Sequence, residues 1–236
     1  MTAAAPQPDI HELEKKLGIA FNKPDLLRQA LVHRSYLNEN PDFPLGHNER
    51  LEFLGDAVLE LVVTEYLYNN YENPEGDLTN WRSSIVNSRK LAEIAKRLDF
   101  EKFLHLSRGE AKDTGRAREY ILGNAFESVV GAIYLDQGFE SAKEFVNREL
   151  TVELPQIIEQ KLYLDPKSKL QERSQEELRV TPQYKVLESS GPDHDKRFTV
   201  GVYLGSELAG TGTGSSKQAA QLDAANAAIK ARGWSQ

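Results

Sequence analysis

Two kinds of hydrophobic pattern divide the chain. From Ile10 to about Pro155, apolar residues recur at intervals of three and four, which is the period of amphipathic helices. From about Asp165 onward, short strand-like runs are separated by Gly, Pro and Asp, as in strands joined by turns. The pattern therefore predicts a helical first part and a second part that contains a sheet.

Helices are expected throughout the first part. Polar segments or Pro and Gly residues separate the stretches that carry the helical period. These stretches are 11–21, 23–37, 47–68, 78–98, 119–138 and 139–154. The segment 106–119 holds two Gly residues and many charges, and we expect a mobile loop there. No strand is predicted, so the first part is expected to be all-α.

The second part is expected to have the element order α-β-β-β-α. Its predicted elements are a helix at 169–179, strands at 183–191, 196–205 and 206–214, and a helix at 215–233. Ser215 or Ser216 is suited to cap the start of the last helix, and Gly233 to end it. The predicted organisation is an all-α domain at 10–155, a linker at 156–164 and an α+β domain at 165–233.

Charge is unevenly distributed between the two parts. The whole chain has a net charge of −7, which alone would argue against a nucleic-acid partner. Residues 166–236 hold 10 Lys and Arg against 8 Asp and Glu, a net of +2, which leaves −9 for residues 1–165. An acidic first part could hold a divalent metal, and a mildly basic second part could touch phosphates.

The composition excludes two further classes. The chain has no Cys, which excludes Cys-ligated zinc. No apolar run approaches the roughly 18 residues of a membrane span.

The expected helix 47–68 carries a row of acids. On a helical wheel four acidic residues lie within an arc of about 80°; they are Glu49, Glu52, Asp56 and Glu60. The other side is predicted to be apolar, with Leu51, Leu54, Val58, Leu61 and Val62. A solvated polar face is the ordinary explanation of such a row. Arg50 is the only Lys or Arg in this stretch, however, and it points away from the acid arc. Crowded carboxylates resist ionising together unless a cation such as Mg²⁺ or Mn²⁺ neutralises them.

The expected helix 119–138 offers further oxygen donors. Asn124 and Glu127 are three residues apart and therefore share one face of that helix. Small residues would let a neighbouring helix approach closely; they are Gly123, Ala125, Gly131 and Ala132. That this helix pairs with the acidic helix is a hypothesis that the spacing alone does not establish.

Several stretches of the chain strongly resemble the ribonuclease III family. They are "LGIAFNKPDLLRQALVHRSY", "NERLEFLGDAVL", "EGDLTNWRSSIVN", "LSRGEAKDTG" and "GNAFESVVGAIYLD". The part from about Asp165 resembles a double-stranded RNA-binding domain. The resemblance covers about 10–233 in the bacterial two-domain arrangement, and "ERLEFLGDA" is its most specific element. It implies an endoribonuclease that cuts double-stranded RNA.

The resemblance assigns roles to the acids. Glu52 and Asp56 match two of the family's four catalytic acids, and Glu127 matches the acid most directly tied to metal binding and cleavage. Asn124 stands where the family normally has Asp, so its amide oxygen would ligate a metal, or orient a metal-bound water, without contributing charge. The implied metal ligands are therefore Glu52, Asp56, Asn124 and Glu127, with Asp56 and Glu127 as catalytic residues.

Three other acids have weaker assignments. Glu49 and Glu75 match acids that the family uses at the dimer interface and near the substrate. Glu60 matches no family role and is interpreted as a surface acid.

The resemblance also implies the reaction and its setting. The expected reaction is Mg²⁺- or Mn²⁺-dependent hydrolysis by a cytoplasmic homodimer with one site per subunit and no membrane association. Products would carry 5′-phosphate and 3′-hydroxyl ends with short 3′ overhangs, and ribosomal RNA precursors are the family's usual substrates. One alternative is an RNA-binding protein with a degraded nuclease domain, which only Asn124 supports. Another is a purely structural helical scaffold, which would not need an RNA-binding fold.

Contacts with RNA are expected from the second domain. A-form RNA hides its base edges in a deep groove, so such a domain reads shape, 2′-hydroxyls and phosphates. The matched contact positions are Gln171, Glu172, Ser174, His194 and Lys217. The family usually has several basic residues at the start of the last helix, where this chain has Lys217 alone.

Overall fold

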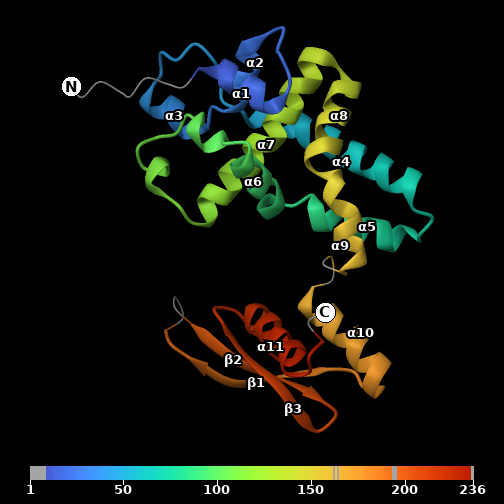
Figure 1. Cartoon of the computed structure of the whole chain (residues 1–236). Coiled ribbons are helices and arrows are strands. Elements are labelled where there is room, and N and C mark those ends of the chain that lie inside the picture. Colours follow the sequence, from blue (N-terminus) through green and yellow to red (C-terminus); the bar gives the residue numbers. More distant parts are fainter. Residues whose placement is uncertain (1–8, 162, 164, 193–195, 235–236) are drawn as a thin grey trace. The chain divides into compact units, whose positions relative to one another are not determined.

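The computed structural model describes residues 9–161, 163, 165–192 and 196–234 (Figure 1). The chain forms two compact units, Met1–Ile157 and Ile158–Gln236. The division falls inside the stretch predicted as a linker, and the first residues of that stretch belong to a helix, α9 (Leu154–Glu159). Within the described residues, no helix combines the length and the apolarity that crossing a membrane requires.

Helices form the first unit, as predicted. Its α-helices are α1 (Ile10–Leu17), α2 (Pro24–Ala30), α3 (Arg34–Glu39), α4 (Glu49–Asn70), α5 (Glu75–Ile85), α6 (Ser88–Arg97), α7 (Arg116–Gln137), α8 (Phe139–Glu149) and α9. Three short 3₁₀ helices join them: η1 (Phe100–Lys102), η2 (Glu110–Lys112) and η3 (Thr151–Glu153).

Two stretches predicted as single helices are each divided. The stretch 23–37 forms α2 and α3, because Val32 lies beside His105 in an isolated β-bridge and the His33 N–H donates to the His105 carbonyl over 3.1 Å. The stretch 78–98 forms α5 and α6, because Asn87 is extended and its side chain accepts a hydrogen bond from the Lys90 N–H, which begins a new helix. The loop predicted at 106–119 is shorter than expected, since α7 begins at Arg116.

Helix α7 forms the centre of the first unit, with α2, α4, α6 and α8 packed against it (Figure 1). Phe126 of α7 is fully buried and stacks with Phe100 and Phe145, whose ring centroids lie 6.5 and 5.6 Å away. On another side of α7, Gly131 meets the carbonyl of Leu51 in α4 so closely that a Cβ on Gly131 would lie 2.3 Å from that oxygen. Of the small residues noted in the sequence, Gly131 therefore brings α7 close to α4, whereas Gly123 faces Ser88 of α6.

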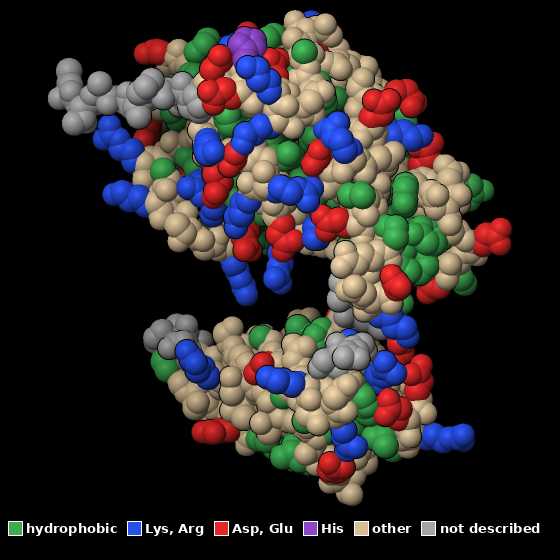
Figure 2. Space-filling model, viewed as in Figure 1, with side chains coloured by type: hydrophobic (Ala, Val, Ile, Leu, Met, Phe, Trp, Pro, Cys, Tyr) green, Lys and Arg blue, Asp and Glu red, His purple; other side chains and the backbone are tan. Residues whose placement is uncertain are grey.

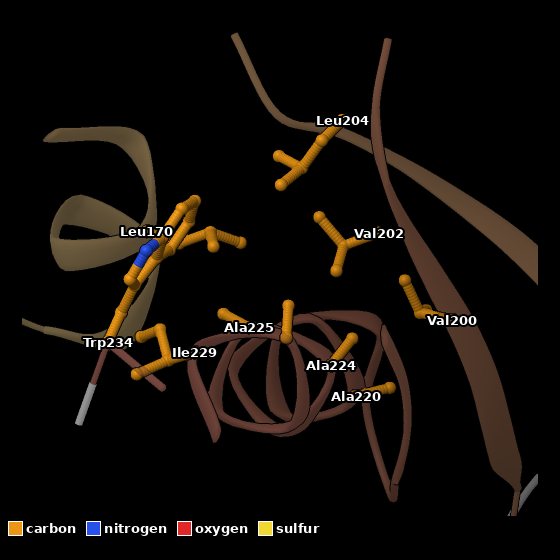
Figure 3. Close-up of a cluster of buried hydrophobic side chains, with 10 residues drawn as sticks. Leu170, Val200, Val202, Leu204, Ala220, Ala224, Ala225, Ile229 and Trp234 are labelled. Carbon is orange, nitrogen blue, oxygen red and sulfur yellow. The ribbon is translucent and has the colours of Figure 1, made fainter. Parts of the chain in front are cut away.

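The second unit has the predicted α-β-β-β-α order. Its elements are α10 (Pro166–Leu178), β1 (Gln183–Ser190), β2 (Arg197–Leu204), β3 (Glu207–Gly214) and α11 (Lys217–Ala231). The strands form an antiparallel sheet in the order β1-β2-β3. Figure 3 shows Val200, Val202 and Leu204 of β2 pointing toward the Ala-rich side of α11. The predicted fold class is confirmed for both units.

Helix α11 lies unusually close to β3, and glycine makes this possible. A Cβ on Gly212 would lie 2.1 Å from the backbone nitrogen of Ala224. The Ala side chains of α11 are short enough to allow the same approach, and Ala220, Ala224 and Ala228 are fully buried. Ser216 caps the helix by accepting from the Ala219 N–H over 3.1 Å, which decides between the two predicted caps.

Candidate active site

The acids of α4 lie in its first three turns. Glu49 is the first residue of the helix, and Glu52 and Asp56 follow on the same side at helical spacing. Glu52 is half-buried, whereas Asp56 is exposed. The first turns of α4 pack against α7. The acids of α4 therefore lie beside a second helix.

Helix α7 brings Asn124 and Glu127 to the same place. Gly55 of α4 contacts the backbone of Glu127, since a Cβ on Gly55 would lie 1.7 Å from the Glu127 carbonyl oxygen. The side chain of Asn124 forms a hydrogen bond with the Glu52 carboxylate. Because a carboxylate oxygen can only accept, the amide NH₂ of Asn124 is the donor. The structure therefore places all four residues that the sequence analysis proposed as ligands where α4 packs against α7.

The crowding of carboxylates changes their acidity. Burial raises the pKa of Glu127 to about 7, with further contributions from the negative charges of Asp56, Glu52 and Glu60. Burial, together with the neighbouring Glu49, also raises the pKa of Glu52 above its usual range, although the hydrogen bond from Asn124 acts in the opposite direction. A partly buried carboxyl whose pKa lies near neutral pH, beside other carboxylates, marks a candidate functional site.

The donors fit a hard divalent cation in their chemistry. Three carboxylates and one amide oxygen are the ligand types that Mg²⁺ and Mn²⁺ prefer, and a cation would relieve the repulsion that adds to the effect of burial on the pKa of Glu127. Within the described residues, no three His, Cys, Asp or Glu side chains converge into a ready-made ligand cage.

Glu49 and Glu75 lie at two different helix starts. Glu49 forms an ion pair with Arg34 over 3.4 Å, and its carboxylate also lies 3.7 Å from His47 Nδ1. Glu75 is the first residue of α5 and accepts a hydrogen bond from the Thr79 hydroxyl over 3.0 Å. Glu75 also lines a groove of about 720 Å³ between α5 and the end of α4, and Glu52, Asp56 and Glu127 are not among the residues that line it.

Two features of α4 were not foreseen. Leu61, which the wheel placed on the apolar side, is 56% exposed, so this apolar side is not buried along its whole length. Phe53 and Tyr68 are also largely exposed on α4, and Figure 2 shows hydrophobic side chains gathered over α5 and the end of α4. The second feature is Arg82 of α5, which pairs with Glu60 over 2.9 Å. Arg50 is the only Lys or Arg in the sequence of α4, and that sequence gave no signal for Arg82, because Arg82 comes from another helix.

In the second unit, the predicted RNA contacts fall into three groups. Gln171 and Glu172 of α10 and Lys217 of α11 are exposed. Ser174 is fully buried and its hydroxyl donates to the Gln171 carbonyl over 3.1 Å, so the prediction that it contacts RNA is wrong. Its position in the sequence matched, but this turn of α10 faces the core of the unit. His194 lies outside the described residues.

The two units match two known families. A family described as Ribonuclease-III-like matches residues 23–154, and one described as Double-stranded RNA binding motif matches residues 166–231. The fold and the acids thus define a helical nuclease joined to a module for double-stranded RNA.

Individual relatives are similar over almost the whole chain. Ribonuclease 3 of Nitratiruptor sp. is 46% identical over 222 residues, which are 94% of this chain and 96% of that protein. Ribonuclease 3 of Oceanobacillus iheyensis is 44% identical and covers 94% and 97% of the two chains. The solved nuclease domain of ribonuclease III from Campylobacter jejuni is 41% identical with a TM-score of 0.56, over 63% of this chain and 98% of that domain.

The chain belongs to the ribonuclease III family. It is an enzyme, an endoribonuclease with a double-stranded RNA-binding domain. The alternatives of a pure binding protein and of a structural scaffold are therefore set aside.

Proposed function

We propose that this protein cleaves double-stranded RNA by divalent-cation-dependent hydrolysis at the site formed by Glu52, Asp56, Asn124 and Glu127. The observation that carries the proposal is the contact of α4 with α7 at Gly55, which holds Glu127 beside the acids of α4. As the family resemblance implies, the products would have 5′-phosphate and 3′-hydroxyl ends with short 3′ overhangs. The substrates would be ribosomal RNA precursors and other structured RNAs in the cytoplasm.

Each side chain has a distinct part in the proposed mechanism. Glu52, Asp56 and Glu127 would hold Mg²⁺, with Mn²⁺ as a substitute, and the Asn124 oxygen would complete the set without adding charge. When bound, the cation would lower the pKa of a coordinated water and neutralise charge on the leaving 3′ oxygen. The pKa of about 7 for Glu127 means that this carboxyl must lose its proton for the site to be fully charged.

The second domain would supply most of the affinity for RNA. Lys217 lies at the start of α11, where the unpaired N–H groups of the helix end also attract phosphate. Gln171 and Glu172 are exposed on α10 and would contact sugar hydroxyls. Because these contacts recognise backbone and shape, the domain would bind duplexes of different sequence.

We also propose that the enzyme is a homodimer, with Glu49 and Glu75 near the interface or the substrate. The exposed stripe on α4, formed by Phe53, Leu61 and Tyr68, supports this proposal, because helical spacing places these three side chains on one side of α4 and an exposed apolar patch is a candidate interface. A Campylobacter jejuni nuclease-domain structure, 40% identical with a TM-score of 0.56, concerns a region involved in dimer formation of that protein.

The central test of the proposed site is Glu127→Gln. Cleavage of a long RNA duplex in Mg²⁺ should fall at least about 100-fold, because a ligand to the cation is lost. Binding of the same duplex should stay nearly unchanged, since it depends on the other domain. Glu140→Gln, which alters an exposed acid on α8, is the matched control. Cleavage by Glu127→Gln at the wild-type rate would overturn the site assignment.

The dimer is tested by the mass of the protein in solution. Phe53→Asp should shift the protein from dimer to monomer in analytical ultracentrifugation, because it puts a charge into the proposed interface. Val152→Asp is the control, since Val152 of η3 is 63% exposed and lies outside the stripe on α4. A wild-type protein that sediments as a monomer at micromolar concentration would contradict the proposal.

A further inference from the structure

Arg82 ties α5 to the acidic helix α4 through two contacts. Its Nε lies 2.9 Å from a Glu60 carboxylate oxygen, and its Nη1 donates to the Thr64 hydroxyl over 2.8 Å. The side chains of Arg82 and Glu60 are 33% and 39% exposed, so the pair is neither deeply buried nor fully solvated.

Glu60 belongs to the same arc of α4 as the proposed ligands. It follows Asp56 by four residues, which is one helical turn. Its negative charge is also among those that raise the pKa of Glu127, so the two carboxylates influence each other across the contact between α4 and α7. An unpaired Glu60 would therefore act as an additional acid at the edge of the site.

We propose that Arg82 is a positioning residue that holds Glu60 as a neutral pair and so confines the charge of the site to Glu52, Asp56 and Glu127. This inference rests on the proposed cation-dependent site. Without Arg82, the extra carboxylate would attract a cation more strongly and would repel the phosphates of RNA. The pair thus sets a balance between cation affinity and substrate affinity.

A purely structural role for Arg82 is the main competing explanation. Helix α5 is also attached to the end of α4 by an edge-to-face contact between Tyr71 and Trp81, with ring centroids 5.1 Å apart. A partly exposed ion pair contributes little to folding stability. Removal of the Arg82 charge should therefore leave the unfolding midpoint of the protein nearly unchanged.

The experiment compares Arg82→Gln, Glu60→Gln, the double variant and Arg82→Lys in the full-length protein. Binding of Mn²⁺ to the RNA-free protein is measured by the loss of the free-ion EPR signal, and KM is measured with one RNA duplex. Lys143→Gln is the matched control, because Lys143 of α8 pairs with Glu65 of the same helix α4 over 2.8 Å.

Arg82→Gln should bind Mn²⁺ about twofold to fivefold more tightly and should raise KM by a similar factor, as expected for one charge close to the site. Glu60→Gln should shift both quantities the other way, Arg82→Lys should resemble wild type, and the double variant should return close to wild type. Lys143→Gln should change neither quantity.

Three results would overturn the inference. A raised KM that persists in the double variant would show that Arg82 contacts RNA directly. A lower unfolding midpoint with unchanged Mn²⁺ affinity would show a structural role. Unchanged values in Arg82→Gln would show that the pair does not influence the site. Failure of the proposed function is seen separately, as cleavage that survives Glu127→Gln.

Discussion

Gly55 of α4 lies directly against the backbone carbonyl of Glu127 in α7, with no room for a side chain between them. A Cβ on Gly55 would lie 1.7 Å from that carbonyl oxygen. Gly131 makes the reciprocal approach one turn further along α7, to the carbonyl of Leu51. The two glycines set the distance between the helices, and this distance in turn places the carboxylate of Glu127 beside those of α4.

The first prediction concerns this contact. Gly55→Ala should lower the free energy of unfolding by about 3 kcal/mol, because a backbone atom opposes the new methyl group and the helices must separate. Cleavage at permissive temperature should fall as well, since Glu127 would move away from Asp56. Gly76→Ala is the control: Gly76 also lies in a helix, nothing lies within 4 Å of its missing Cβ, and the change should stabilise by up to about 1 kcal/mol. Equal effects of the two substitutions in denaturant titrations would contradict the prediction.

The second prediction concerns the pH dependence of stability in the absence of divalent cations. The pKa of Glu127 is raised to about 7, chiefly by burial and next by Asp56. Between about pH 4.5 and 7 the folded protein keeps a proton that the unfolded chain loses, so wild-type stability falls as the pH rises through this window. Glu127→Gln removes this dependence. It should match wild type near pH 4 and exceed it by up to about 3 kcal/mol at pH 8.

Urea titrations in EDTA at several pH values would measure this difference. A constant difference between the two proteins from pH 4 to pH 8 would show that Glu127 titrates like an exposed carboxyl. Addition of Mg²⁺ at pH 8 should stabilise wild type more than the variant, because the cation binds the ionised carboxylate.

The helical period and the turn residues were sufficient to predict most of the long helices and the strands, although not α9, which lies partly in the predicted linker. They could not predict where the stretches 23–37 and 78–98 are interrupted. The first interruption depends on His105, whose backbone pairs with the chain around Val32 from a distant part of the sequence. The second depends on Asn87, which ends one helix and caps the next within an apparently continuous pattern.

The candidate site shows the same division between local and tertiary information. A helical wheel could place Glu52 and Asp56 on one face, and the resemblance could add Glu127. Neither could show that Arg82 neutralises Glu60, because that pairing depends on how α5 folds back on α4. Ser174 illustrates the opposite case, since its place in a matching segment suggested RNA contact, whereas the packing of α10 buries it.

The third prediction concerns binding of RNA by the second domain. Lys217→Ala should weaken binding of duplex RNA roughly threefold to tenfold at low salt and should reduce the dependence of affinity on salt by up to about one counterion, because one phosphate contact is lost. Lys230→Ala is the matched control, since Lys230 is an exposed lysine in the last turn of the same helix. Binding is measured in EDTA to prevent cleavage. Equal loss in both variants would indicate a general charge effect and not a contact at the start of α11.

The last prediction concerns Asn124, where the family normally has Asp. Its side-chain NH₂ donates to the Glu52 carboxylate, so Asn124→Asp removes a hydrogen bond and places a second negative charge against the first. Without a cation the variant should therefore lose about 1–2 kcal/mol of stability at neutral pH. With a cation the added charge becomes favourable, and the Mg²⁺ concentration for half-maximal cleavage should fall roughly threefold to tenfold. The added negative charge thus lowers stability without a cation, because it repels Glu52, and raises cation affinity, because it attracts Mg²⁺.

Unfolding in EDTA and cleavage over a range of Mg²⁺ concentrations separate the possible outcomes. Asn70→Asp, at the far end of α4, makes the same chemical change away from the acids and should leave the Mg²⁺ dependence unmoved. If Asn124→Asp shifts stability but not the Mg²⁺ dependence, position 124 is not a ligand and only orients Glu52. If it lowers cleavage at every Mg²⁺ concentration, the site depends on the amide donor. At saturating Mg²⁺ the two proteins should converge if Asn124 serves only as a weaker ligand than Asp.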